Sequence, residues 1–298
     1  MTPGRKSLSA AGLPGLFHVA DQMSLRGQRD HLRGLWARLV LAIVAAAGGA
    51  FTVRIGAVDV MAVTTGVALL AILLIELAFR ADSPEIRWYD GRALAESAKS
   101  MGWRYAVGGL PFPLGTDEVA VARRFIDQTE TLLKDGPTSE IPAPRGPSVT
   151  DAMRELRAAD LPARRAAYIS GRIQDQRTWY ENRAEVNDHH ARTSRKILYV
   201  ITAVGIVAAF ARAFGFVSFD LAGVASALIA AAAAWAGAKQ YATLARAYAY
   251  AAMELRIVED RLGLETDEAS WAAEVADAEE AISREHIMWR ASRSQATS

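Results

Sequence analysis

The sequence of 298 residues contains no cysteine. This absence excludes a disulfide framework and thiol chemistry, and it agrees with a polar mass that lies in a reducing compartment. The sequence also has no GxSxG nucleophile elbow and no GxxxxGK(S/T) loop that cradles phosphates. We therefore expect a protein that is not an enzyme and that holds no cofactor.

Neither sign of charge is in excess, with 34 Lys and Arg against 33 Asp and Glu. Binding of nucleic acid needs a concentrated basic face, so we expect no nucleic acid partner. Arginines beside the apolar segments more simply contact anionic lipid. Residues 1–25 have no continuous apolar core followed by a small-residue cleavage site, so we expect no cleaved signal peptide.

Long uncharged apolar runs are abundant. Four runs of 15, 16, 15 and 18 residues lie between charges, at 39–53, 60–75, 197–211 and 221–238. A bilayer core needs about 20 residues at a rise of about 1.5 Å each, so most of the runs are short by themselves. Boundary residues such as Arg38 and Lys196 extend them, because long side chains lie along acyl chains while their charges reach water. The runs predict four membrane spans in two hairpins.

A soluble helical bundle with two buried hairpins is the alternative. Such a hairpin normally shows a polar face at helical spacing, whereas the stretch LVLAIVAAAGGAFTV from Leu39 is apolar all round. Aromatic residues also gather near the ends of the runs, as in the aromatic belt of a membrane protein. We predict an all-helical integral membrane protein with two transmembrane hairpins and a cytoplasmic helical layer, without strands of useful length.

Basic residues are unevenly distributed around the hairpins. Several precede and follow each hairpin, whereas each tight loop between spans contains one arginine. The positive-inside rule places such loops outside and both termini in the cytoplasm. We expect a multi-pass protein of the inner membrane.

Four of the ten prolines fall in residues 136–149, which indicates a linker. The linker separates a first two-span domain at 26–135, which follows an N-terminal tail at 1–25, from a second two-span domain at 150–298. Each half has a basic helix that enters the membrane, a hairpin and a helix that leaves it. This repeated plan indicates an internal duplication.

Periodicity and end signals predict helices outside the spans as well. The expected segments are 83–107, 116–135, 163–196 without a break into the third span, a continuation of the fourth span through Tyr241 toward Arg261, and 266–290. The last segment is amphipathic and must pack on other helices or on a second subunit. Its apolar face consists of Trp271, Val275, Ala278, Ile282 and Trp289.

One cluster has metal-like spacing, namely Glu185, Asp188, His189 and His190. Glu185 and His189 share a helix face, so two ligands could meet an ion. Adjacent histidines point about 100° apart on a helix, and a third ligand would have to come from elsewhere. We favour a solvated helix surface and expect no metal.

Polar side chains in the second span carry a stronger functional signal, because their burial costs free energy that a partner must offset. The stripe at helical spacing consists of Thr65, Leu69, Ile72 and Glu76, and Thr64 adjoins it. If it faces an aqueous path, Thr64 and Thr65 line a pore and Glu76 forms an acidic ring at the cytoplasmic mouth. Alternatively, the hydroxyls bond the backbone four residues earlier, and Glu76 is solvated or pairs with Arg80.

The fourth span repeats a small residue at every fourth position. These residues are Ala222, Ser226, Ala230, Ala234 and Ala238. A face of small residues lets another helix approach closely, either the third span of the same chain or the same face of a neighbour. We predict helix packing at this stripe and a homo-oligomer.

Each outer loop contains an arginine and an aspartate, Arg54 with Asp59 and Arg212 with Asp220. We favour local ion pairs over gating elements for both.

The stretch RWYDGRALAESAKSMGWRYAVGGLPF from Arg87 to Phe112 directly follows a two-span hairpin. It resembles the SLATT proteins, two-transmembrane effector domains of bacterial conflict systems. The second half resembles them too, through a long basic helix with Trp179 and Tyr180 and an exit helix at Tyr241. The resemblance covers about residues 25–135 and 160–295 and implies a tandem of two such domains.

The resemblance implies a membrane pore that kills or arrests an infected cell when a nucleotide-signal partner activates it. Since this chain shows no nucleotide-binding loop, the sensor would be a separate cytoplasmic protein. Two functions stay open: an oligomeric channel or pore-forming effector gated through its cytoplasmic helices, and a non-conducting membrane scaffold that docks a cytoplasmic partner.

Overall fold

The computed structural model describes residues 8–115, 117–134, 141–144 and 146–294, with side chains up to residue 283. It divides into two compact units. The head unit comprises Met1–Gln28, Glu85–Arg183 and Ala247–Ser298, and the hairpin unit comprises Arg29–Pro84 and Ala184–Arg246.

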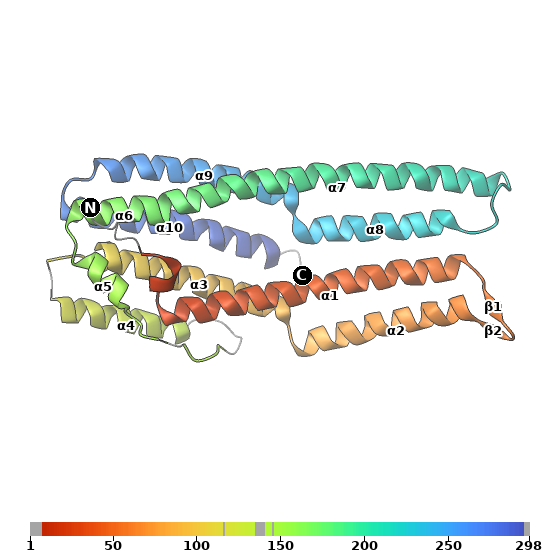
Figure 1. Cartoon of the computed structure of the whole chain (residues 1–298), viewed down its shortest axis with the longest axis horizontal. Helices are drawn as coiled ribbons and strands as arrows, with labels where there is room; N and C mark the ends of the chain where they lie inside the picture. Colours follow the sequence, from red (N-terminus) through yellow and green to blue (C-terminus); the bar gives the residue numbers. More distant parts are fainter. Residues whose placement is uncertain (1–7, 116, 135–140, 145, 295–298) are drawn as a thin grey trace, which may run out of the picture. The chain divides into compact units, whose positions relative to one another are not determined.

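The first hairpin of the hairpin unit joins the later part of α1 (Gly15–Ala50) to α2 (Val60–Ala81) (Figure 1). Its turn is a pair of antiparallel two-residue strands, β1 (Arg54–Ile55) and β2 (Val58–Asp59). The two helices run antiparallel on either side of this turn.

The second hairpin joins the later part of α7 (Asp175–Ala213) to α8 (Leu221–Lys239). In the described chain, four helical stretches are long and apolar enough to cross a membrane. The prediction of an all-helical, multi-pass membrane protein with two two-span hairpins is confirmed.

An aspartate begins the second helix of each hairpin. The Asp59 carboxylate accepts a hydrogen bond from the backbone N–H of Met61 at 3.0 Å, and the Asp220 carboxylate accepts one from that of Gly223 at 3.1 Å. Amide groups in the first turn of a helix have no partner within the helix, and a side-chain oxygen at this position satisfies one of them. The two aspartates therefore fix where α2 and α8 start.

Shorter polar helices and the polar parts of the long helices build the head unit. Its remaining elements are η1 (Ala10–Gly12), α3 (Pro84–Val107), α4 (Glu118–Lys134), α5 (Asp151–Arg157), α6 (Leu161–Tyr168), the π-helical segment η2 (Ile169–Gln174), α9 (Tyr241–Leu264) and α10 (Glu268–Ser294). Helices from both halves of the sequence thus share one unit.

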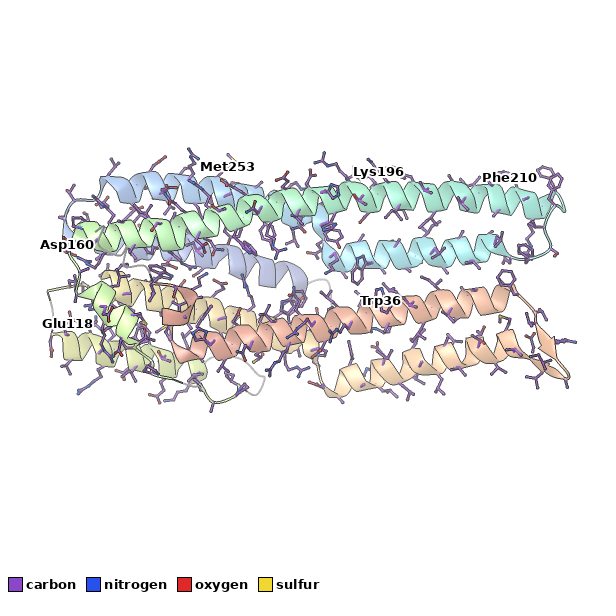
Figure 2. All side chains as sticks on the ribbon, in the orientation of Figure 1. Trp36, Glu118, Asp160, Lys196, Phe210 and Met253 are labelled. Atoms are coloured by element: carbon purple, nitrogen blue, oxygen red, sulfur yellow. The ribbon has the colours of Figure 1, made fainter. Side chains whose placement is uncertain are left out.

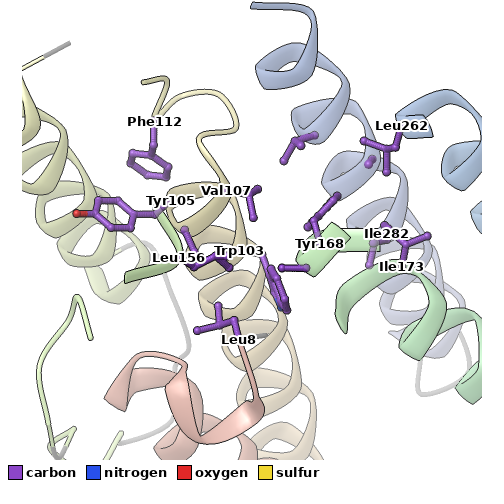
Figure 3. Packing of buried hydrophobic residues seen from close by; sticks show 14 of the residues in the cluster. Leu8, Trp103, Tyr105, Val107, Phe112, Leu156, Tyr168, Ile173, Leu262 and Ile282 are labelled. Atoms are coloured by element: carbon purple, nitrogen blue, oxygen red, sulfur yellow. The ribbon is translucent and has the colours of Figure 1, made fainter. Parts of the chain in front are cut away.

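Three aromatic rings pack against one another in the core of the head unit, and Figure 3 labels two of them, Trp103 and Tyr168. The ring of Tyr168 lies edge-on to Trp103 and to Trp271, at centroid distances of 5.7 and 5.8 Å. The indole N–H of Trp271 donates to the carbonyl of Val107 at 2.8 Å, so this N–H keeps a hydrogen-bond partner although the ring is buried. These rings join α3, α6 and α10.

Two buried arginines hold the turn that ends α3. The Arg157 guanidinium donates to the carbonyls of Phe112 and Pro113, at 2.8 and 2.9 Å. The Arg164 guanidinium donates to the carbonyl of Val107 at 2.6 Å and pairs with Glu268. The predicted end of this helix at 107 is confirmed. The two arginines satisfy carbonyls that lie at or beyond the end of the helix.

Two expected continuous helices are not regular. The helix predicted over 163–196 contains the π-helical segment Ile169–Gln174 between α6 and α7. The continuation of the fourth span through Tyr241 is wrong, because Gln240 adopts a left-handed conformation with φ of 50° and ends α8. A left-handed residue cannot continue a right-handed helix, so α9 starts in a new direction.

Residues 8–25, predicted as part of a tail, take part in the head unit, where Leu8, Leu13 and Leu16 are buried. In α10, the predicted apolar face from Trp271 to Ile282 is buried, as expected. The Trp289 side chain lies outside the described residues.

Candidate functional site

An ion pair joins the two helices of the first hairpin. Arg38 Nη1 of α1 lies 2.5 Å from Glu76 Oε2 of α2, and the same guanidinium lies over the Phe79 ring at 5.2 Å. The side chains are 25% and 51% exposed. Glu76 thus pairs with Arg38 on the other helix of its own hairpin, rather than with Arg80 on its own helix.

The two threonines of the predicted pore stripe bond backbone carbonyls. Thr64 Oγ1 donates to the Val60 carbonyl at 2.9 Å. Thr65 Oγ1 lies 3.1 Å from the Met61 carbonyl and 3.2 Å from the Ala45 carbonyl of α1. Thr65 therefore faces α1 in this chain, and pore lining by Thr64 and Thr65 stays a prediction.

A glycine makes that approach of α1 to α2 possible. A Cβ atom placed on Gly48 would lie 2.5 Å from Thr65 Oγ1 and 3.0 Å from the Met61 carbonyl oxygen. Such distances are too short for real atoms, so the first hairpin depends on glycine here.

Ala225, which is not part of the small-residue stripe of α8, packs against α7 at Gly205. A Cβ on Gly205 would lie 3.0 Å from the Ala225 methyl group. Helix packing at the stripe itself stays a prediction. The middle of the stripe is exposed within this chain, and the Ser226 hydroxyl turns back to its own helix. The stripe consists of Ala222, Ser226, Ala230, Ala234 and Ala238.

The outer loops differ in their use of charge. Arg212 Nη1 lies 2.6 Å from Asp220 Oδ1. In the other loop, Arg54 and Asp59 are opposite each other in the strand pair, and the Asp59 carboxylate caps α2.

Two members of the histidine cluster contact neighbouring side chains. Asp188 pairs with Arg192, and the His190 ring lies 5.2 Å from the Tyr241 ring. Across the described residues, no group of three or more potential ligands is placed to hold a metal ion.

A buried polar network in the head unit was not foreseen from the sequence. Arg172 of the π-helical segment and Glu279 of α10 form a two-pronged ion pair, with Nη2–Oε2 and Nε–Oε1 distances of 2.7 and 2.9 Å. Ser100 Oγ of α3 donates to the same carboxylate at 2.7 Å, and Tyr168 of α6 donates its O–H at 2.9 Å. Neither member of the ion pair is exposed to solvent. Four segments of the chain therefore meet at one carboxylate.

The electrostatics of the network favour the charged pair. Burial alone would raise the pKa of Glu279, but the charge and hydrogen bonds of Arg172, with those of Ser100 and Tyr168, outweigh burial and hold this pKa below its ordinary value. The pKa of Tyr168 lies well above its ordinary value, mainly because the side chain is buried and secondly because of the nearby Glu279 charge. The phenol therefore keeps its proton and remains a hydrogen-bond donor. Nearby, burial and the Arg172 charge lower the pKa of Lys99.

The position of Arg172 in a π-helical segment is informative. A π segment accommodates one extra residue in a helix, and such segments are frequent at functional sites. Arg172 Nη1 is buried, and no residue that the structure describes accepts a hydrogen bond from it. The segment leads directly into α7, the helix that contains the third span.

Comparisons with known proteins agree with the two-hairpin architecture. The family model for SMODS and SLOG-associating 2TM effector domain 3 matches residues 14–165, and that for 2TM effector domain 1 matches residues 168–289. No curated protein and no solved structure matches the chain. Since the first match alone covers half of the sequence, the chain belongs to the SLATT family of two-transmembrane effector domains and carries two of them in tandem.

Proposed function

We propose that this membrane protein is an oligomeric pore-forming effector, without enzymatic activity, that acts in a bacterial conflict or defence system. The observation that carries the proposal is the Arg38–Glu76 ion pair between α1 and α2. Ionised groups at the end of an apolar span are costly unless they reach water or a partner, and they commonly mark ion pathways. Repeated around a ring of subunits, this pair would form a charged pore mouth.

Several copies are needed for such a pore, because two hairpins are too few to surround a wide path. The stripe of small residues on α8, exposed in the single chain, supports close packing of another copy. Thr64 and Thr65 would line the path if α1 and α2 separate on opening.

The buried network is the proposed gate control. One extra residue in the π-helical segment shifts the helix that follows by about 100° relative to a regular α-helix. Loss or movement of that segment would therefore rotate α7, and Arg172 is held in it by Glu279. A signalling partner that disturbs the pair would act on the third span through α7.

Ion flux from liposomes that contain the purified chain tests the pore. We expect flux above that of empty liposomes, and we expect Glu76→Ala to change ion preference and Thr65→Leu to change conductance. Asp82→Asn, an acid beyond the end of the same span, serves as the matched control. Unchanged conductance and selectivity in both test variants would show that the stripe does not line the pore.

A paired substitution tests the gate. Arg172→Met with Glu279→Leu replaces the buried ion pair by apolar groups, which is often neutral for stability. We expect this folded double variant to conduct at a different basal level from the wild type. The same flux in both proteins, with unchanged activation by a partner, would contradict control through the network.

Placement in the inner membrane with both termini in the cytoplasm is part of the proposal and has a direct test. The chain has no cysteine, so the reactivity of a single introduced cysteine shows on which side of the membrane that position lies. Cysteines at Thr52 or Ser218 in the hairpin loops should react with an impermeant maleimide in intact cells, and a cysteine at Val119 in the head unit should react only after lysis. The reverse labelling pattern would show that the loops are cytoplasmic and the head unit is outside.

A membrane scaffold is the second candidate, supported by an exposed apolar stripe on α9. Tyr250, Met253 and Ile257 are 62%, 69% and 55% exposed and follow one another at helical spacing (Figure 2 labels Met253). Apolar side chains in a row on a polar helix often mark a docking surface. Met253→Glu with Ile257→Glu should abolish capture of a partner from membranes, whereas Val119→Glu, an equally exposed site on α4, should not.

A further inference from the structure

A cavity of about 820 Å³ lies within the hairpin unit, between the two hairpins. One face each of α1, α7 and α8 forms its walls, and the start of α9 closes one end. Its volume falls in the range of about 300–1,000 Å³ that is typical of sites for small molecules. The proposed pore makes no use of it.

The cavity has an apolar end and a polar end. Ile43, Ile201 and Leu228 line the part that lies inside the spans. Arg195 and Gln240 line the other end, where the third span begins and the fourth ends. None of the residues described as lining the cavity is acidic. The site therefore suits an elongated molecule with an apolar tail and a negative head.

The polar end is built by an unusual backbone conformation. Gln240 has φ of 50°, a region that residues other than glycine rarely adopt, and its N–H donates to the Ala236 carbonyl at 2.8 Å. Tyr241 and Thr243, which follow this turn at the start of α9, line the cavity. The break that the sequence did not predict thus shapes the opening.

We propose that this cavity binds an anionic phospholipid of the bilayer, with its phosphate at Arg195 and Ser194 and an acyl chain along Leu228 toward Ile43. No residue that the structure describes forms a hydrogen bond or ion pair with Arg195, so its guanidinium is available to a phosphate. Arginine binds phosphate through two parallel hydrogen bonds. This site is independent of the pore and would stand if the pore proposal failed.

Charge and hydrocarbon together favour a lipid over a free anion. An acyl chain gains little by moving from the bilayer into an apolar wall, because lipid tails are as apolar as leucine. Selection among lipids must therefore come from the head group. Lys196 follows Arg195, and the Lys239 ammonium lies 5.1 Å from the Trp235 ring that lines the cavity, so the surrounding charge is positive. A free phosphate would leave the apolar end without an occupant.

Lipid retention by the purified full chain tests the proposal. Native mass spectrometry would compare phosphatidylglycerol with phosphatidylcholine of the same acyl chains. We expect about tenfold stronger retention of phosphatidylglycerol, because both lipids have the phosphate but the choline ammonium of phosphatidylcholine repels the basic end of the cavity, and a difference of about 1.4 kcal/mol is tenfold. Arg195→Gln should abolish this preference, and Ala232→Phe, which fills the apolar wall, should reduce retention of both lipids.

Arg192→Gln is the matched control, since Arg192 lies one turn earlier on α7, pairs with Asp188 and is not among the lining residues. It should leave the preference unchanged, with all variants checked for the same helical content and elution volume. Equal retention of both lipids by the wild type would overturn the proposal. Equal losses in Arg192→Gln and Arg195→Gln would overturn it in favour of a diffuse basic surface, and displacement of the lipid by millimolar inorganic phosphate would overturn it in favour of a free anion.

Discussion

The head unit and the hairpin unit bury opposite kinds of side chain. The head unit encloses large aromatic residues and an ion pair, as in Trp103, Trp271 and the Arg172–Glu279 pair. The hairpin unit encloses mainly small residues, while large apolar ones such as Val67 and Phe210 are about 60% exposed. The first arrangement is stable in water because apolar surface is hidden from it, and the second needs lipid or other helices around it.

The largest effect is expected when a buried charge in the head unit loses its partner. Glu279→Gln keeps the side-chain volume but removes the charge that faces Arg172, and loss of one partner of a buried pair costs about 3–5 kcal/mol. The free energy of unfolding of the head unit should fall by that amount, measured by denaturant titration with tryptophan fluorescence. A loss below about 1 kcal/mol, the value for exposed pairs, would show that the network is solvated.

Acid should remove the same charge reversibly. The folded pKa of Glu279 lies below its ordinary value of 4.5, so the pair adds stability above pH 4.5 that is lost as pH falls through the folded pKa. The raised pKa of Tyr168 has the opposite sign, with stability present below pH 10 and lost as pH rises further. Unfolding at a series of pH values should show both losses. The loss of stability in acid should be smaller in Glu279→Gln than in the wild type. Identical pH profiles of the two proteins would show that protonation of Glu279 does not cause this loss.

Two glycines, one in each unit, differ in how closely their helices pack. A Cβ on Gly91 of α3 would lie 2.6 and 2.8 Å from backbone atoms of Ser24 and Ala20, whereas one on Gly66 of α2 meets nothing within 4 Å. Gly91→Ala should destabilise the head unit by about 1–3 kcal/mol through overpacking. Gly66→Ala should be neutral or stabilise α2 by up to about 1 kcal/mol through helix propensity. Thermal unfolding in detergent would contradict this contrast if both substitutions had the same effect.

The smallest effect is expected at the ion pair of the hairpin unit. Glu76→Gln breaks a half-exposed pair, and such pairs contribute about 0–1 kcal/mol. Thermal unfolding should therefore barely change, although ion preference should. A large loss of stability would mean that the pair is buried, as in the head unit.

The sequence predicted the spans well and the buried network poorly, for a physical reason. Apolar runs and helix ends are local signals, so the four spans and the end of α3 at Val107 could be read directly. The network joins Ser100 to Glu279 across 179 positions, and nothing local marks an arginine or glutamate that will be buried. The left-handed Gln240 was missed because no glycine marks that break.

For the predicted site residues as well, the sequence shows the local spacing but not the long-range partners. Helical spacing placed Thr65 and Glu76 on one stripe, but which helix faces that stripe depends on packing. Gly48 provides the contact with Thr65, and Arg38 provides that with Glu76. Spacing within one helix carries no information about such partners.

The aspartates that begin α2 and α8 have a consequence for biogenesis. A helix whose first amide groups already have partners loses less hydration when it crosses hydrocarbon than one with open ends. Asp59 and Asp220 meet this need from within their own loops, and neither takes it from the other hairpin. Each hairpin is therefore equipped to insert by itself, in the order in which the ribosome delivers it, before the rest of the chain has been synthesised.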